Sequence, residues 1–144
     1  MKIDFWQLSR DPAEKVVALI AQRVLDAGDR LLVVSADEEQ RGSISRALWK
    51  AGPESFLANG EAGAKGAASQ PILLSSETEA ANGASHVIYA DGTFRDAAGF
   101  DRAFLLFDDN TVQAARDVWR ALDGKDDLER AFFRQDGGKW VKVA

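Results

Sequence analysis

Two arginines and a tryptophan near the C-terminus carry the most distinctive chemistry in this sequence. Arg116, Trp119 and Arg120 stand at positions i, i+3 and i+4 of a helical pattern, so they share one face within a single turn. Guanidinium groups bind carboxylates through paired hydrogen bonds, and an indole ring can cover an apolar side chain. The trio therefore suits an acidic peptide that ends in a hydrophobic residue. A solvated helix face with Trp119 half-buried is the alternative, and the spacing alone favours it.

A second pair of aromatic residues, Trp49 and Phe56, flanks a predicted helix end and turn. Large aromatic side chains at such a place anchor either the core or an interface with another protein. The residue pattern by itself favours the core. Trp6 is interpreted as strand packing, and Trp140 could hold the C-terminal tail against the domain.

The residue types that metal, redox and nucleophilic sites use are scarce. Cysteine is absent, which excludes disulfides and thiolate chemistry. His86 is the only histidine, and its place at the start of a predicted strand favours a core or edge role. Asp37–Glu39 and Asp108–Asp109 lie at predicted helix starts, where carboxylates stabilise the helix dipole without any metal. We therefore predict no metal and no cofactor.

Sequence signatures of nucleotide and hydrolase sites are also missing. The chain has no GxGxxG, no GxxxxGK[ST] and no GxSxG pattern, and its glycines at 60, 63 and 66 fall in a predicted loop. We therefore expect a protein without an active site of its own. The competing hypothesis is a small nucleotide-binding α/β enzyme, whose site would lie at the carboxyl ends of the strands near Ser35, Ser75 and Asp91.

The composition is that of a soluble domain rather than of a DNA-binding or membrane protein. The chain has 144 residues, 46% of them hydrophobic, and a formal net charge of −5. A protein that holds DNA through phosphates usually carries a basic total, so direct binding of single-stranded DNA, our third hypothesis, is disfavoured. No apolar run is long enough to cross a membrane and no signal peptide is evident, so we expect a cytoplasmic protein.

Alternating strand and helix patterns predict a single α/β domain over residues 1–144. Strands are expected at residues 2–8, 30–35, 71–75, 86–90 and 102–107, and helices at 12–28, 37–49, 108–122 and 126–134. Residues 58–69 are expected to be a flexible loop. The predicted architecture is three-layer α/β/α, with a mostly parallel five-stranded sheet and helices on both faces.

The order of these segments resembles the chi subunit family of bacterial DNA polymerase III, nearly from end to end. No single segment is diagnostic, but their order and spacing together are specific. The matching segments are Ile3–Leu8, Gly28–Val34, Asp37–Gln40, Ala47–Trp49, Glu54–Leu57, Gln70–Leu74, Asn82–Ala84, Phe104–Phe107, Ala115–Arg116 with Trp119, and Gln135–Trp140. One departure is Ala58–Asn59, where many members of the family have Pro-His.

The resemblance implies a non-catalytic adaptor in DNA replication. Chi proteins bind the acidic C-terminal tail of the single-stranded-DNA-binding protein and a small subunit, psi, that joins them to the clamp loader. The resemblance also implies a binding site for this tail at Arg116, Trp119 and Arg120. It further implies a surface for the partner subunit at Trp49 and Phe56. Where psi is missing, that surface would meet a helicase, another clamp-loader component or no partner at all. Any contact with DNA would be indirect.

Overall fold

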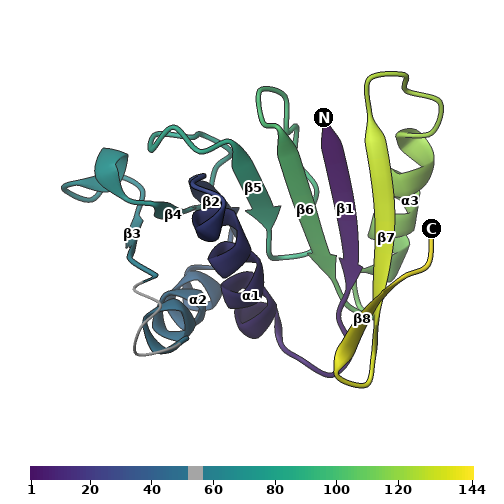
Figure 1. Cartoon of the computed structure of the whole chain (residues 1–144), viewed down its shortest axis with the longest axis horizontal. Coiled ribbons are helices and arrows are strands. Elements are labelled where there is room, and N and C mark those ends of the chain that lie inside the picture. Colours follow the sequence, from purple (N-terminus) through teal and green to yellow (C-terminus); the bar gives the residue numbers. More distant parts are fainter. Residues whose placement is uncertain (52–56) are drawn as a thin grey trace.

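The computed structural model describes residues 1–51 and 57–144, and in this part of the chain the strands form one eight-stranded sheet (Figure 1). The strand order is β3-β4-β2-β5-β6-β1-β7-β8. All neighbouring strands are parallel except β7 and β8. The strands are β1 (Lys2–Gln7), β2 (Leu31–Val34), β3 (Asn59–Glu61), β4 (Ile72–Ser75), β5 (His86–Tyr89), β6 (Arg102–Phe107), β7 (Glu129–Asp136) and β8 (Lys139–Lys142).

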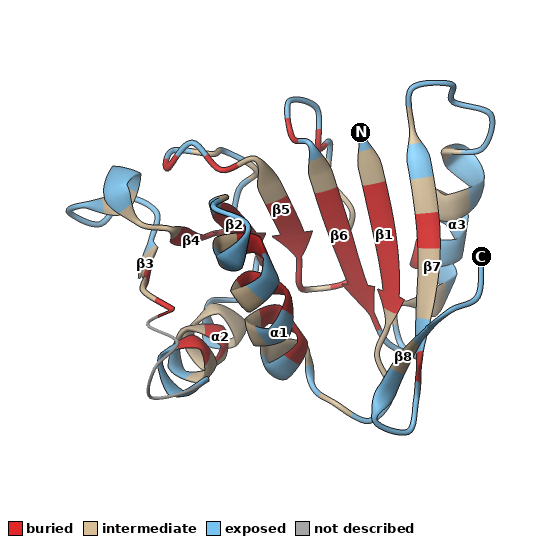
Figure 2. Cartoon of the chain, in the orientation of Figure 1, coloured by how far each residue is buried: buried red, intermediate tan, exposed pale blue. Residues whose placement is uncertain are grey.

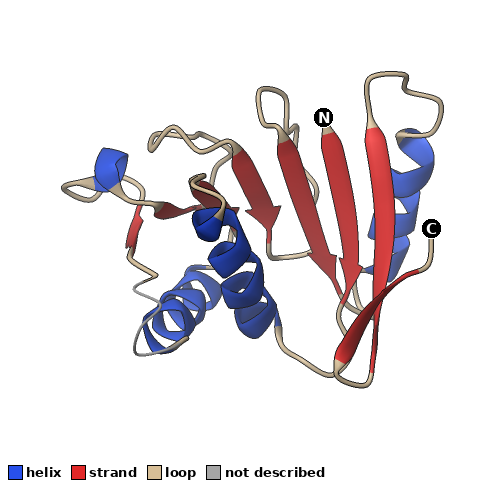
Figure 3. Cartoon of the chain, viewed as in Figure 1, coloured by secondary structure: helices blue, strands red, loops and turns tan. Residues whose placement is uncertain are grey.

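Helices cover both faces of this sheet, which confirms the predicted three-layer α/β class (Figure 3). The helices α1 (Ala13–Asp26) and α2 (Glu38–Lys50) pack on one face, and α3 (Val112–Ala121) packs on the other. Leu31–Val34 is fully buried, as expected of a parallel strand covered on both sides. Buried residues concentrate in β5, β6 and β1, whereas α3 and β8 are largely exposed (Figure 2).

The five predicted strands are all present, but the sheet is wider than predicted because β3, β7 and β8 extend it. The prediction of a helix at residues 126–134 is wrong, since this segment contributes most of β7. The physical reason is the pair Phe132 and Phe133. A strand sends successive side chains to opposite faces, and these two rings pack against Phe5 and Trp6 respectively, on the two faces of the sheet.

The prediction of a flexible loop at residues 58–69 is also wrong in part. Residues 59–61 form β3, which pairs in parallel with β4, and Ala67–Ser69 forms a short 3-10 turn. The buried side chain of Asn59 accepts a hydrogen bond from Ser45 at 2.6 Å and donates to the carbonyl of Leu57 at 3.0 Å. These contacts give order to a segment that has few large side chains.

The closing β-hairpin is fastened to the first strand. Trp140 of β8 packs on Trp6 of β1 with ring centroids 4.7 Å apart, which confirms that it holds the C-terminal segment against the domain. Gln135 of β7 accepts hydrogen bonds from the backbone of Arg10 and Asp11, each at 3.1 Å. In the residues that the structure describes, no helix is long and apolar enough to cross a membrane.

A buried ion pair joins β1 to β6. Asp4 is fully buried, and the Nε atom of Arg102 donates to its Oδ2 atom at 3.0 Å, with a second contact from the same guanidinium group. The guanidinium also lies 4.9 Å from the ring centroid of Phe104. Because a buried carboxylate is costly without a partner, the pair holds the two central strands in register.

We expect Arg102→Ala to lower the free energy of unfolding by about 3 kcal/mol, because it leaves the Asp4 carboxylate buried without its cation. Urea denaturation of the purified protein measures this. Arg23→Ala, which removes an exposed arginine, serves as the matched control. The double variant Asp4→Leu with Arg102→Leu should recover most of the loss, and a loss below 1 kcal/mol in Arg102→Ala would contradict the role of the pair.

Candidate functional site

Arg116, Trp119 and Arg120 all lie on α3, one face of which packs on the sheet. The helix begins after Asp108, whose carboxylate accepts hydrogen bonds from the backbone N–H groups of Asn110 and Thr111 at 2.9 and 3.2 Å. Ala115 is buried against the sheet, Trp119 is half-buried, and both arginines are exposed. The structure therefore brings the three predicted residues together, with the indole at the border between the core and the solvent.

Trp119 is packed at its inner side by two phenylalanine rings. Its indole meets Phe5 of β1 edge to face, with ring centroids 5.1 Å apart, and meets Phe132 of β7 in the same way at 5.8 Å. Such aromatic pairs add to the free energy of burying the rings. The half-buried indole is what the structural alternative predicted, yet the geometry also leaves part of it open beside two accessible cations.

The two arginines of α3 differ in their partners. Arg120 contacts Asp117 at 2.8 Å, with side chains 67% and 64% exposed. A surface pair of this kind contributes about 0–1 kcal/mol, so an incoming carboxylate can displace it. Within the described residues Arg116 forms no ion pair. Both guanidinium groups are therefore available to a ligand.

A third arginine, Arg130 of β7, belongs to the same cluster and was missed by sequence reasoning. Its Cζ atom lies 4.1 Å from the centroid of the Trp119 ring, within the range of a cation–π contact. It also donates hydrogen bonds to the carbonyl of Trp119 and, at 2.8 Å, to Asp123. Arg130 could have been found only if residues 129–136 had been predicted as a strand that pairs with β1.

Trp49 lies in the last turn of α2 with 59% of its surface exposed, more than any other large hydrophobic side chain among the described residues. The core interpretation is therefore wrong for Trp49. A hollow of about 620 Å³ lies between α1 and α2 and is lined by Leu19, Ala47 and Lys50 among others, but Trp49 does not line it. Phe56 lies outside the described residues.

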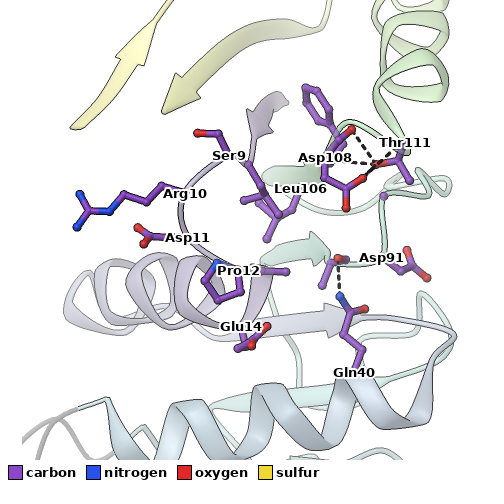
Figure 4. A pocket seen from close by; sticks show the side chains of 15 residues that line it. Ser9, Arg10, Asp11, Pro12, Glu14, Gln40, Asp91, Leu106, Asp108 and Thr111 are labelled. Carbon is purple, nitrogen blue, oxygen red and sulfur yellow. Dashed lines mark hydrogen bonds between the residues drawn. The ribbon is translucent and has the colours of Figure 1, made fainter. Parts of the chain in front are cut away.

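A separate cavity of about 490 Å³ opens at the carboxyl ends of β1, β5 and β6 (Figure 4). Of the three residues predicted for a nucleotide site, only Asp91 lines it. The hydroxyl of Ser35 bonds to Gln40 and to the N–H of Asp37, at 2.5 and 3.2 Å. Ser75 lies at the end of β4, and its hydroxyl accepts from the backbone after it. The three residues lie at adjacent strand ends, since the N–H of Ser35 donates to the carbonyl of Ser75 at 3.0 Å and the N–H of Ala36 donates to Asp91, but only Asp91 faces the cavity.

The charge of this cavity is unfavourable for phosphate. Its described lining residues include only one cationic side chain, that of Arg10. They include four carboxylates, those of Asp11, Glu14, Asp91 and Asp108. Because these carboxylates and the phosphates of a nucleotide carry the same negative charge, their repulsion makes binding of a nucleotide less favourable. Nor do the described residues contain any group of three or more histidines, aspartates and glutamates that could hold a metal.

Asp91 is engaged in holding the loops around the cavity. It pairs with Arg95 at 2.7 Å and accepts from the N–H of Ala36 at 2.9 Å. Burial alone would raise the pKa of Asp91. Hydrogen bonds from Arg95 and from the N–H groups of Ala36 and Thr93 outweigh burial and hold this pKa below its ordinary value of 3.8. The carboxylate is therefore ionised and structural.

The fold and its surfaces define an α/β protein whose exposed cations and aromatics, rather than its cavity, are equipped for binding. The family model described as DNA polymerase III chi subunit, HolC, matches residues 1–127, and the chain belongs to this family. The family comprises accessory subunits of a replicative polymerase. The matched residues include Trp49 and the trio on α3, whereas β7 and β8 lie beyond them. A search of curated proteins found no match.

We expect Asp91→Asn to lower the free energy of unfolding by about 1–3 kcal/mol at neutral pH, because a charged, hydrogen-bonded group is lost. The lowered pKa sets the sign of the pH dependence. The contribution of Asp91 is present above pH 3.8 and disappears as the pH falls through the folded-state pKa. Urea denaturation from pH 7 to pH 3 measures this.

The stability difference between the wild type and Asp91→Asn should therefore shrink at acid pH. Asp109→Asn, which removes an exposed carboxylate, is the matched control and should show a small difference throughout. A difference that stays constant down to pH 3 would contradict the assigned role of the charge.

Proposed function

We propose that this chain is a non-catalytic accessory subunit that binds the acidic C-terminal tail of single-stranded-DNA-binding protein and links it to the clamp loader of bacterial DNA polymerase III. The observation that carries the proposal is the exposed pair Arg116 and Arg120 beside the half-buried Trp119. Family membership supports the replication role. The 144 residues would act as one domain in the cytoplasm, where such a polymerase works.

The proposed recognition step joins charge to an apolar contact. An acidic side chain of the tail would replace Asp117 as the ion-pair partner of Arg120. Another would pair directly with Arg116. The terminal hydrophobic residue would lie against the exposed part of the Trp119 indole. Because the whole chain carries a net charge of −5, attraction is confined to this surface, and salt should weaken it.

The second proposed surface surrounds Trp49. An indole that is 59% exposed at a helix end has the character of an interface anchor. The partner would be a psi-like subunit, another clamp-loader component or a helicase. Phe56 is proposed for the same surface on the family resemblance alone. Because this surface lies on α2 and the tail site lies on α3, across the sheet, the chain can bind two partners at once.

We expect an acidic peptide with a hydrophobic C-terminal residue to bind with micromolar affinity, about −8 kcal/mol at 1 μM. Arg116→Ala and Arg120→Ala should each weaken binding roughly fivefold, in line with the loss of a charge-assisted hydrogen bond. Asp117→Asn should strengthen it, because it removes the carboxylate that competes for Arg120. Fluorescence anisotropy of a labelled peptide measures all three.

Two controls make this titration decisive. Arg46→Ala removes an exposed arginine from α2, on the opposite face, and should leave the affinity unchanged. A peptide without its terminal hydrophobic residue should bind at least tenfold more weakly, because the indole contact is lost. Equal binding of the two peptides would remove Trp119 from the proposed site.

Trp49→Ala should reduce recovery of clamp-loader subunits at least tenfold while leaving the affinity for the tail peptide within twofold of the wild type. Arg116→Ala should show the reverse. Quantitative mass spectrometry of proteins recovered from a cell extract on the immobilised chain compares the two. Loss of the same partner by both variants would contradict the assignment of two separate surfaces.

A further inference from the structure

The C-terminal hairpin supplies a residue that the family match does not include. The matched segment ends at residue 127, whereas β7 begins at Glu129 and β8 ends at Lys142. On the α3 side of the sheet, β7 presents Arg130 and Phe132, and both contact the indole of Trp119. The surroundings of Trp119 are therefore completed by residues outside the matched segment.

Arg130 is held at three points around Trp119. Its guanidinium lies 4.1 Å from the centroid of the indole ring, donates to the carbonyl of Trp119 and contacts the carboxylate of Asp123 at 2.8 Å. The carbonyl belongs to the last turn of α3, where backbone acceptors lack partners within the helix. One side chain thus satisfies the helix end and fixes the ring.

Arg130 orients the indole of Trp119 rather than adding to the electrostatic attraction of an acidic ligand. The charge of Arg130 is already matched by Asp123, whereas Arg116 forms no ion pair within the part of the chain that the structure describes. The indole is confined by the rings of Phe5 and Phe132 and by the guanidinium group of Arg130. Confining a binding side chain before the ligand arrives lowers the entropy lost on binding.

We propose that Arg130 is a positioning residue, which holds Trp119 in the orientation that accepts the hydrophobic end of an acidic peptide. This inference rests on the proposed function and assigns a further residue to the same site. The planar guanidinium is required for stacking and for its paired hydrogen bonds, so a lysine at this position retains the charge but loses the orientation.

The test compares Arg130→Lys and Arg130→Gln with Arg134→Ala, the matched control. Arg134 is exposed and lies four residues along β7, on the same side of the sheet as Arg130. Anisotropy titration with the acidic peptide should show affinity reduced roughly fivefold in both Arg130 variants and by less than twofold in Arg134→Ala. The Arg130→Lys variant should keep the salt dependence of the wild type, because the charge remains.

A second readout does not require the peptide. The indole N–H resonance of Trp119, assigned by its loss in Trp119→Phe, should shift and broaden in both Arg130 variants and stay unchanged in Arg134→Ala. If Arg130→Gln fails to fold in thermal unfolding, Arg130→Lys carries the test.

Wild-type affinity in Arg130→Lys, or an unchanged Trp119 resonance, would overturn the positioning role. An equal loss of affinity in Arg134→Ala would overturn it as well, because the effect would then be one of charge. If the wild type fails to bind the peptide, the proposed function falls, and the resonance still decides whether Arg130 orients Trp119.

Discussion

The packing of one indole on two strands is the contact on which the binding surface depends. Trp119 rests on Phe5 of β1 and Phe132 of β7, so its position is set by the pairing of those two neighbouring strands. The same contact determines where Arg116 and Arg120 project, because all three residues lie within one turn of α3. The core and the candidate site therefore share a residue.

The cavity and the candidate binding surface differ in their charged groups. At the carboxyl ends of the parallel strands, where many α/β proteins bind nucleotides, the charged residues that line the cavity are mostly carboxylates. The hydroxyls and carboxylates at those strand ends are occupied in holding loops, as Ser35 and Asp91 illustrate. Two exposed arginines beside a half-buried aromatic ring lie on α3, and the most exposed aromatic ring of the described residues lies on α2. This distribution fits a protein that acts through its partners.

Local patterns determined much of the fold and part of the site. The apolar runs correctly predicted β1, β2, β4, β5 and β6. Helical spacing placed Arg116, Trp119 and Arg120 on one helix face. Residues 126–134 misled the prediction because only the partner strand β1 reveals why Phe132 and Phe133 need opposite faces. Because of the same error, Arg130 was not predicted to contact Trp119. The exposure of Trp49 depends on which face of α2 packs on the rest of the domain, and a local sequence pattern does not determine this.

Together, α3 and the exposed part of Trp119 form the surface that we propose receives an acidic chain terminus. Mapping of ¹H–¹⁵N chemical shifts during titration with an acidic peptide that ends in a hydrophobic residue tests it most directly. A tail site on α3 predicts the largest changes at the Trp119 indole N–H and at the Nε–H groups of Arg116 and Arg120. Changes centred on the cavity around Asp91, or none at all, would contradict it.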